Sequence, residues 1–133
     1  MAYWKMAPDD IDLFGTVPHE ISNLEDLGEL SLDRSLSWSG NLTGSIPSTL
    51  GLLENLYNLN LSFNQLTGSI PSELLTKATL EQLNLNDNRL SGSLDGIELL
   101  TGLLVLQIHN NAFSGTIPPE IGNIPGLGKV FFL

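Results

Sequence analysis

Few residues of this chain have the types and spacing that catalysis or metal binding requires. The two histidines, His19 and His109, are separated by most of the sequence, too far to share a metal ion or to pair with one serine. The acidic residues Asp9, Asp10 and Asp12 lack the glycine and the distal glutamate of an EF-hand calcium loop. Solvated surface charge is therefore the expected role of this acidic run.

A glycine-rich segment near the C-terminus, GLGKV at 126–130, is close to a phosphate-binding loop. It fails that motif because residue 123 is asparagine where glycine is needed and Val130 stands in place of serine or threonine. No paired carboxylates and no nucleophile beside a base are evident elsewhere. The sequence predicts no enzymatic activity, no cofactor and no metal site.

Composition narrows the choice of partners. The 133 residues include 5 basic and 15 acidic side chains, giving a formal charge of −10, which disfavours nucleic acid and anionic lipid as partners. The chain has no cysteine, so neither disulfides nor a cysteine-based zinc site can form. The N-terminal segment MAYWKMAPDD has no apolar core of a signal peptide, and no apolar run reaches the length of a membrane span.

A repeat runs through most of the chain and is marked by two independent elements. One is a Gly-x-apolar-Pro segment, and the other is an alternating Leu-x-Leu segment that precedes it. The glycine recurs at positions 15, 44, 68, 92 and 115, and the alternating pair recurs at 30/32, 59/61, 83/85, 106/108 and 130/132. Both elements give steps of 23 to 29 residues, so a single backbone unit recurs along the chain.

The pattern within each unit, LxxLxxLxLxxNxLxGxIP, predicts one winding of a coil. Alternation puts the leucines on one side of a short strand, and one coil cannot bury them without a neighbour above and below. The prediction is an α/β solenoid, a curved right-handed coil with a parallel sheet of about five short strands on its concave face and irregular or 3-10 segments on its convex face. It spans 11–133 as four to five repeats of 23–29 residues, after an N-terminal extension at 1–10.

The recurring asparagine and glycine residues of each unit are expected to have structural roles in the turns. An asparagine follows three of the predicted strands, where its amide can satisfy main-chain groups of its own coil and of the next; these are Asn64, Asn88 and Asn111, and the first unit has Gly40 at this position. A glycine follows in each unit and is expected to supply a positive φ or a close approach between coils; these are Gly44, Gly68, Gly92 and Gly115.

The segment LYNLNLSFNQLTGSIPSEL at 56–74 resembles the plant-type leucine-rich repeat, and the resemblance covers residues 11–133. Similar arrays form the ectodomains of plant receptor-like kinases and receptor-like proteins, and polygalacturonase inhibitors. The resemblance implies a solenoid that binds proteins or peptides, in an extracellular or cell-surface setting. Two departures are Leu94-Asp95 in place of Ile-Pro, and Lys77 where a leucine is expected.

The register of the strands predicts which side chains point outward on the concave face, and we expect a partner to bind there. These are Glu29, Ser31, Asp33, Asn58, Asn60, Ser62, Gln82, Asn84, Asn86, Val105, Gln107, His109, Lys129 and Phe131. This surface is polar and rich in amides, which suits hydrogen bonding to an extended backbone. Solvated strands also favour such residues, so the composition alone leaves both interpretations open.

Two further features bear on binding. The first repeat is longer than the others, and the excess segment 33–40 contains Trp38, which is either an interface anchor or a lid over the first coils. Asn41 and Asn60 begin glycosylation sequons, and a glycan on Asn60 would obstruct the concave face.

The sequence begins and ends inside a repeat, at residues 11–18 and at Val130–Leu133, which predicts a segment of a longer protein with uncapped ends that could associate. The predicted function is a non-catalytic module for binding proteins or peptides, the recognition part of a receptor-like or secreted protein. Two alternatives stay open. One is a structural or surface-binding solenoid for polysaccharide or ice, and the other is the ectodomain of a receptor-like kinase whose kinase domain lies elsewhere.

Overall fold

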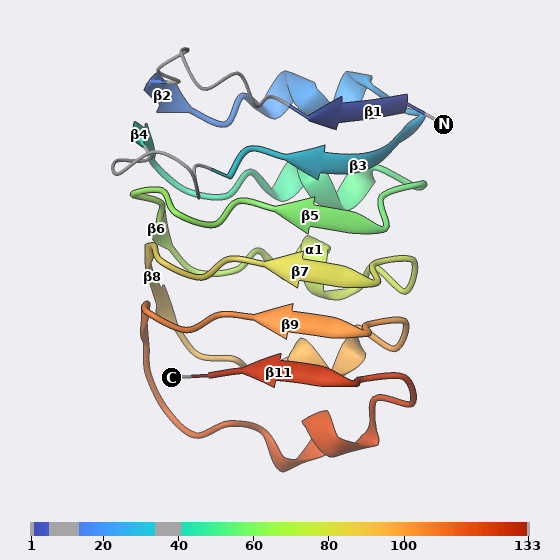
Figure 1. Cartoon of the computed structure of the whole chain (residues 1–133), viewed down its shortest axis with the longest axis vertical. Coiled ribbons are helices and arrows are strands. Elements are labelled where there is room, and N and C mark those ends of the chain that lie inside the picture. The colour runs from blue at the N-terminus through green and yellow to red at the C-terminus, as the bar shows by residue number, and fades with distance from the viewer. Residues whose placement is uncertain (1, 6–13, 34–40, 133) are drawn as a thin grey trace.

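The computed structural model describes residues 2–5, 14–33 and 41–132, with the backbone alone at 2–5 and 41. A six-stranded parallel sheet forms one side of the molecule (Figure 1). In spatial order its strands are β1 (Ala2–Lys5), β3 (Leu27–Ser31), β5 (Asn58–Asn60), β7 (Gln82–Asn84), β9 (Val105–Gln107) and β11 (Lys129–Phe131). Each strand is followed by a return path behind the sheet, so the chain winds as a right-handed coil.

The strand register agrees with the repeat in the sequence. Leu59 pairs with Leu30 on one side and with Leu83 on the other. Leu106 continues the row and pairs with Leu83 and with Val130. The predicted stacking of Leu-x-Leu segments is therefore confirmed.

The sheet has one strand more than the five expected. Ala2–Lys5, in the segment predicted to be an N-terminal extension, pairs with β3 and places Trp4 opposite Leu30. The sequence did not predict this strand because AYWK carries no Leu-x-Leu alternation, although its aromatic residues favour extended structure.

Short helical segments run along the opposite side of the coil (Figure 1). Four are 3-10 helices, η1 (His19–Asn23), η2 (Ser48–Leu52), η3 (Ile97–Leu99) and η4 (Pro119–Asn123), and the fifth is the one-turn helix α1 (Ser72–Leu75). Small parallel ladders form where the glycine elements stack, between β2 (Phe14–Thr16) and β4 (Asn41–Thr43), and among β6 (Thr67–Gly68), β8 (Arg89–Gly92) and β10 (Ala112–Phe113).

Most helical segments begin directly after the Ile-Pro residues of the repeat. Proline is the N-cap residue of four of them, because its fixed φ directs the chain into the turn. Where Asp95 replaces that proline, Gly96 takes the N-cap position with a φ of 90°, and its N–H donates to the Glu98 carboxylate at 3.1 Å. A different local device therefore starts η3 at the departure from the pattern.

Leucine side chains fill the interior between the two layers. Leu59, Leu61 and Leu66 of one coil are fully buried, as are Leu83, Leu85 and Leu90 of the next. At roughly 1.5–3 kcal/mol for burying each such side chain, the stacked rows supply the main stabilisation of a coil that cannot fold alone.

The asparagine of each repeat ties neighbouring coils together. Asn64 Nδ2 donates to the carbonyl oxygen of Leu32 on the preceding coil at 3.0 Å and to that of Leu61 on its own coil at 3.2 Å. Its Oδ1 accepts from the N–H of Leu42 at 3.3 Å. Asn88 and Asn111 repeat this set of contacts one and two coils later.

Candidate binding surface

The outward side of the six-stranded sheet, here called the sheet face, contains the side chains expected to meet a partner. Most are half-buried, and Lys129 and Phe131 of β11 are exposed. The half-buried ones are Glu29, Asp33, Asn58, Asn60, Gln82, Asn84, Val105, Gln107 and His109. These residues form adjacent columns because each strand pairs in register with the next.

Three of the side chains predicted to be exposed are buried. Ser31, Ser62 and Asn86 are each less than a tenth exposed, so the prediction was wrong for them. The backbone bends inward as each strand ends, and the side chains bond their neighbours. Ser31 Oγ donates to Asp33 Oδ1 at 2.6 Å, and Ser62 Oγ donates to Asn60 Oδ1 at 2.7 Å.

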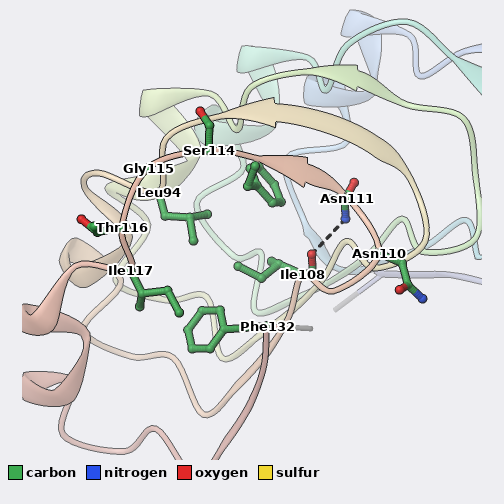
Figure 2. Close-up of a pocket in the computed structure, with 10 residues that line it drawn as sticks. Leu94, Ile108, Asn110, Asn111, Ser114, Gly115, Thr116, Ile117 and Phe132 are labelled. Atoms are coloured by element: carbon green, nitrogen blue, oxygen red, sulfur yellow. Dashed lines mark hydrogen bonds between the residues drawn. The ribbon is translucent and has the colours of Figure 1, made fainter.

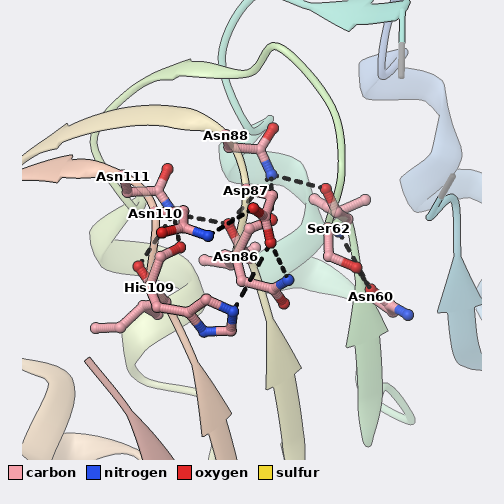
Figure 3. A network of polar contacts seen from close by, with 11 residues as sticks. Asn60, Ser62, Asn86, Asp87, Asn88, His109, Asn110 and Asn111 are labelled. Atoms are coloured by element: carbon pink, nitrogen blue, oxygen red, sulfur yellow. Dashed lines mark hydrogen bonds and ion pairs between the residues drawn. The ribbon is translucent and has the colours of Figure 1, made fainter. Parts of the chain in front are cut away.

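A polar cluster lies where β7 and β9 end (Figure 3). Asp87 stands at its centre, where Oδ2 accepts from Asn86 Nδ2 and Oδ1 accepts from Asn110 Nδ2, both at 2.7 Å. His109 Nε2 lies 3.7 Å from Asp87 Oδ2. We call Asn84, Asn86, Asp87, His109 and Asn110 the Asp87 cluster.

Sequence reasoning did not find Asp87, because this residue lies beyond the alternating Leu-x-Leu segment of its repeat. In three repeats, the residue before the asparagine that joins neighbouring coils has a left-handed backbone. Its φ is 58° at Phe63, 56° at Asp87 and 54° at Asn110. This conformation turns the side chain out at the edge of the sheet face. The signal in the sequence was the position immediately before the asparagine of the repeat.

Several buried polar atoms of the sheet face have no hydrogen-bond partner among the described residues. They are Asn58 Oδ1, Asn84 Oδ1, Asn86 Oδ1 and His109 Nδ1. Buried polar atoms are almost always paired, because an unpaired one loses its hydration without compensation. Three of these four atoms belong to the Asp87 cluster.

Hydroxyl side chains form a second regular surface, here called the hydroxyl face, on both sides of the repeated glycine. All of them are exposed, in one row of Thr43, Thr67, Ser91 and Ser114 and a second row of Thr16, Ser45, Ser69, Ser93 and Thr116. Thr43 Oγ1 donates to the Gly15 carbonyl oxygen at 3.3 Å, and Thr67 Oγ1 donates to that of Gly44 at 3.4 Å. The first row is thus oriented by the preceding coil.

The glycine between the two hydroxyl rows allows the coils to approach. Gly44, Gly68, Gly92 and Gly115 all have positive φ, between 77° and 88°. At Gly92 an added Cβ would also lie 3.1 Å from Ser69 Cβ, so side chains larger than hydrogen disturb the neighbouring coil.

A pocket of about 330 Å³ opens at the C-terminal end of the coil (Figure 2). It is lined by apolar side chains, among them Ile108, Phe113, Ile117 and Phe132, and by the polar Asn110 and Asn111. The ring of His109 lies edge-on to Phe131 with centroids 6.2 Å apart, which continues the aromatic surface onto the sheet face. This apolar end is the surface for which the sequence predicted association, and that association stays a prediction.

Several predicted residues lie outside the described part of the chain. Trp38 and the acidic run Asp9, Asp10 and Asp12 are among them, and for Asn41 only the backbone is described. His19 lies in η1, on the helical side, and His109 follows β9. Within residues 2–5, 14–33 and 41–132 there is no group of three or more potential metal-ligating side chains. No helix in this part of the chain is long and apolar enough to cross a membrane.

The sequence pattern of the Leucine Rich Repeat family matches residues 55–76, 79–100 and 102–124, just over half of the chain. The chain therefore belongs to the leucine-rich repeat family. Its stacked parallel strands and the asparagines that join neighbouring coils recur with the period of the matched repeats. A search of curated proteins found no match.

Solved structures of plant proteins share the fold. The ectodomain of the receptor kinase SOBIR1 from Arabidopsis thaliana is 33% identical, with a TM-score of 0.82 over 92% of this chain and 65% of that one. The structure described as PEPR1-AtPEP1 is 43% identical, with a TM-score of 0.80 over 89% of this chain and 16% of that one. A plant ice-binding protein is 30% identical, with a TM-score of 0.82 over 91% and 38% respectively. The chain spans less than two thirds of each of these relatives.

Proposed function

We propose that this chain is a non-catalytic recognition module that binds a peptide or protein across the sheet face. It serves as the recognition part of a receptor-like or secreted protein, which includes the ectodomain of a receptor-like kinase. The observation that carries this proposal is the continuous array of half-buried amide side chains across β5, β7 and β9. The likeness to SOBIR1 and to the complex named PEPR1-AtPEP1 supports it.

The physical reason is preorganisation. Asn60, Asn84 and Gln107 project from adjacent strands that are held in register by main-chain hydrogen bonds and a fully buried leucine core. A partner that lies across these strands meets donors and acceptors whose positions are already fixed, so little ordering entropy is lost on binding.

A peptide-display selection tests this function. The intact chain is immobilised, peptides are selected from a random library, and their affinities are measured by calorimetry. Asn60→Ala and Gln107→Ala are expected to weaken binding about tenfold, the effect of losing one or two hydrogen bonds. Thr101→Ala and Glu120→Ala, which are exposed on the helical side, are the matched controls. Failure to select any binder, or equal losses in the control variants, would contradict the proposal.

A second candidate function is binding to ice through the hydroxyl face. The specific observation in its favour is regularity, because four successive repeats place serine or threonine on both sides of the glycine, whereas the columns of the sheet face are mixed. The first repeat departs from this pattern, since the exposed Phe14 precedes Gly15. Successive ladder positions repeat at a spacing of roughly 4.8 Å, a periodicity that an ordered lattice can match. The likeness to a plant ice-binding protein supports this candidate.

Inhibition of ice recrystallisation discriminates between the two functions. If the hydroxyl face binds ice, Ser69→Lys and Ser93→Lys abolish inhibition because a long charged side chain interrupts the lattice contact, and Gln82→Lys on the sheet face leaves it intact. Sedimentation with insoluble cellulose tests whether the chain binds a polysaccharide instead of ice. Absence of inhibition by the wild-type chain would exclude ice binding and leave the sheet-face function untouched.

A further inference from the structure

The Asp87 cluster contains a carboxylate that is held firmly but not enclosed. Asp87 lies in the left-handed turn after β7, and its side chain is 28% exposed. Each carboxylate oxygen accepts one amide hydrogen bond, from Asn86 and from Asn110. A carboxylate has about four acceptor positions, so each oxygen can accept a further donor from outside.

Residues beside this carboxylate carry buried acceptors that have no donor among the described residues. Asn86 is only 3% exposed, and its Nδ2 is bonded to Asp87 while its Oδ1 has no partner among the described residues. Asn84 Oδ1, at the end of β7, is likewise buried and unpaired among the described residues. The cluster therefore has an excess of acceptors over donors.

The histidine adds to that excess. His109 directs Nε2 toward the Asp87 carboxylate, which favours a proton on Nε2 (Figure 3). In the neutral ring Nδ1 is then an acceptor, and this atom is buried and has no partner in the described part of the chain. The accessible part of the cluster is the Asp87 carboxylate, whose remaining acceptor positions suit N–H donors that carry a positive charge.

We propose that the Asp87 cluster binds the guanidinium group of an arginine in the partner peptide or protein. An arginine side chain carries five N–H donors in a planar fork, which can bond both oxygens of a carboxylate. Calcium fits less well, because it needs six to eight oxygen ligands and the cluster has one carboxylate. The acidic balance of the chain, −10, favours such a cationic partner at longer range.

This inference rests on peptide binding by the sheet face, and a double-mutant cycle tests it separately. The reagents are peptides selected on the intact chain, each compared with a version in which arginine is replaced by citrulline, its neutral isostere. Binding is measured to wild type and to Asp87→Asn. Asparagine tolerates the left-handed backbone, as Asn110 does at the equivalent place in the next coil, so the variant is expected to fold.

With wild type, the citrulline peptide is expected to bind about ten- to a hundredfold more weakly, the effect of losing hydrogen bonds to a charged group. With Asp87→Asn, both peptides bind equally weakly. Glu120→Gln, which removes an exposed carboxylate on the helical side, is the matched control and retains the difference. Selected peptides without arginine, or an equal citrulline effect in Asp87→Asn, would overturn the inference. In both outcomes sheet-face binding would still stand, whereas a selection that yields no peptide would overturn both.

Discussion

The side-chain amide of Asn88 donates a hydrogen bond to the carbonyl oxygen of Leu61, 2.9 Å away on the preceding coil. The same nitrogen also donates to Leu85 on its own coil, while Oδ1 accepts from the N–H of Leu66. One side chain therefore satisfies main-chain groups that two strands leave unpaired as they turn inward. The solenoid is held together along its axis by such contacts as well as by leucine packing.

Replacing this asparagine should destabilise the fold. Asn88→Ala leaves a donor and several acceptors unpaired at a half-buried site and is expected to lower the free energy of unfolding by about 1–3 kcal/mol. Urea denaturation measures the change. Asn123→Ala, at an exposed position at the end of η4, is the control and should be neutral. An unchanged unfolding midpoint in Asn88→Ala would refute the role of Asn88 in joining neighbouring coils.

Close approach between coils on the helical side predicts a second sensitive position. A Cβ added at Gly102 would clash with the backbone carbonyl oxygen of Ala78 on the preceding coil. Because the backbone must shift to admit it, Gly102→Ala should cost about 1–3 kcal/mol. At Gly122 an added Cβ meets nothing within 4 Å, so Gly122→Ala is the matched control in thermal unfolding. Equal melting temperatures in the two variants would contradict the packing argument.

The aromatic residue in a left-handed turn predicts a stabilising substitution. Phe63 has a φ of 58° and is 39% exposed, so it combines an unfavourable backbone conformation with incomplete burial. Phe63→Asn should raise the free energy of unfolding by about 1 kcal/mol, since asparagine tolerates this conformation. Phe63→Leu keeps the strain and should not stabilise. If calorimetric unfolding shows Phe63→Asn to be less stable than wild type, packing of the ring outweighs the backbone effect.

The lysine at a leucine position predicts a pH-dependent effect. Burial lowers the pKa of the Lys77 ammonium, and the Glu54 carboxylate partly offsets this, while Nζ donates to the Gly51 carbonyl oxygen at 3.3 Å. Charged Lys77 therefore costs stability at neutral pH. As pH rises through the lowered pKa toward the ordinary lysine value, the folded chain releases its proton first and the cost declines.

Lys77→Met should accordingly stabilise the protein by about 1 kcal/mol at neutral pH. Its advantage over wild type should shrink as the pH becomes alkaline. Urea denaturation at a series of pH values measures this, with Lys129→Met on the exposed end strand as the control. An advantage of Lys77→Met that grows with pH would show that desolvation of the ammonium is not the cause.

The repeat in the sequence was sufficient to predict the order and register of the interior strands. The strands pair in the order of the chain, through Leu30, Leu59, Leu83 and Leu106. They do so because a coil with two apolar edges has no other way to bury its leucines. It was also sufficient to place Asn58, Asn60, Gln82 and Asn84 on the outer side of the sheet, since side chains alternate along a strand.

Alternation failed at the strand ends. Ser31, Ser62 and Asn86 continue the outward pattern in the sequence, yet the backbone leaves the strand there and buries them. Their burial depends on the inward turn and on hydrogen bonds to neighbouring side chains, which no pattern of hydrophobicity encodes.

Leucine spacing by itself determined that this chain is a stacked coil, because a periodic apolar edge admits one packing solution. The tertiary structure alone decided where the acceptors converge. Asp87, Asn110 and His109 come together only because one left-handed turn lies above the next, at a distance set by main-chain hydrogen bonds between neighbouring coils. Contacts between side chains of neighbouring coils therefore could not be predicted from the amino-acid sequence.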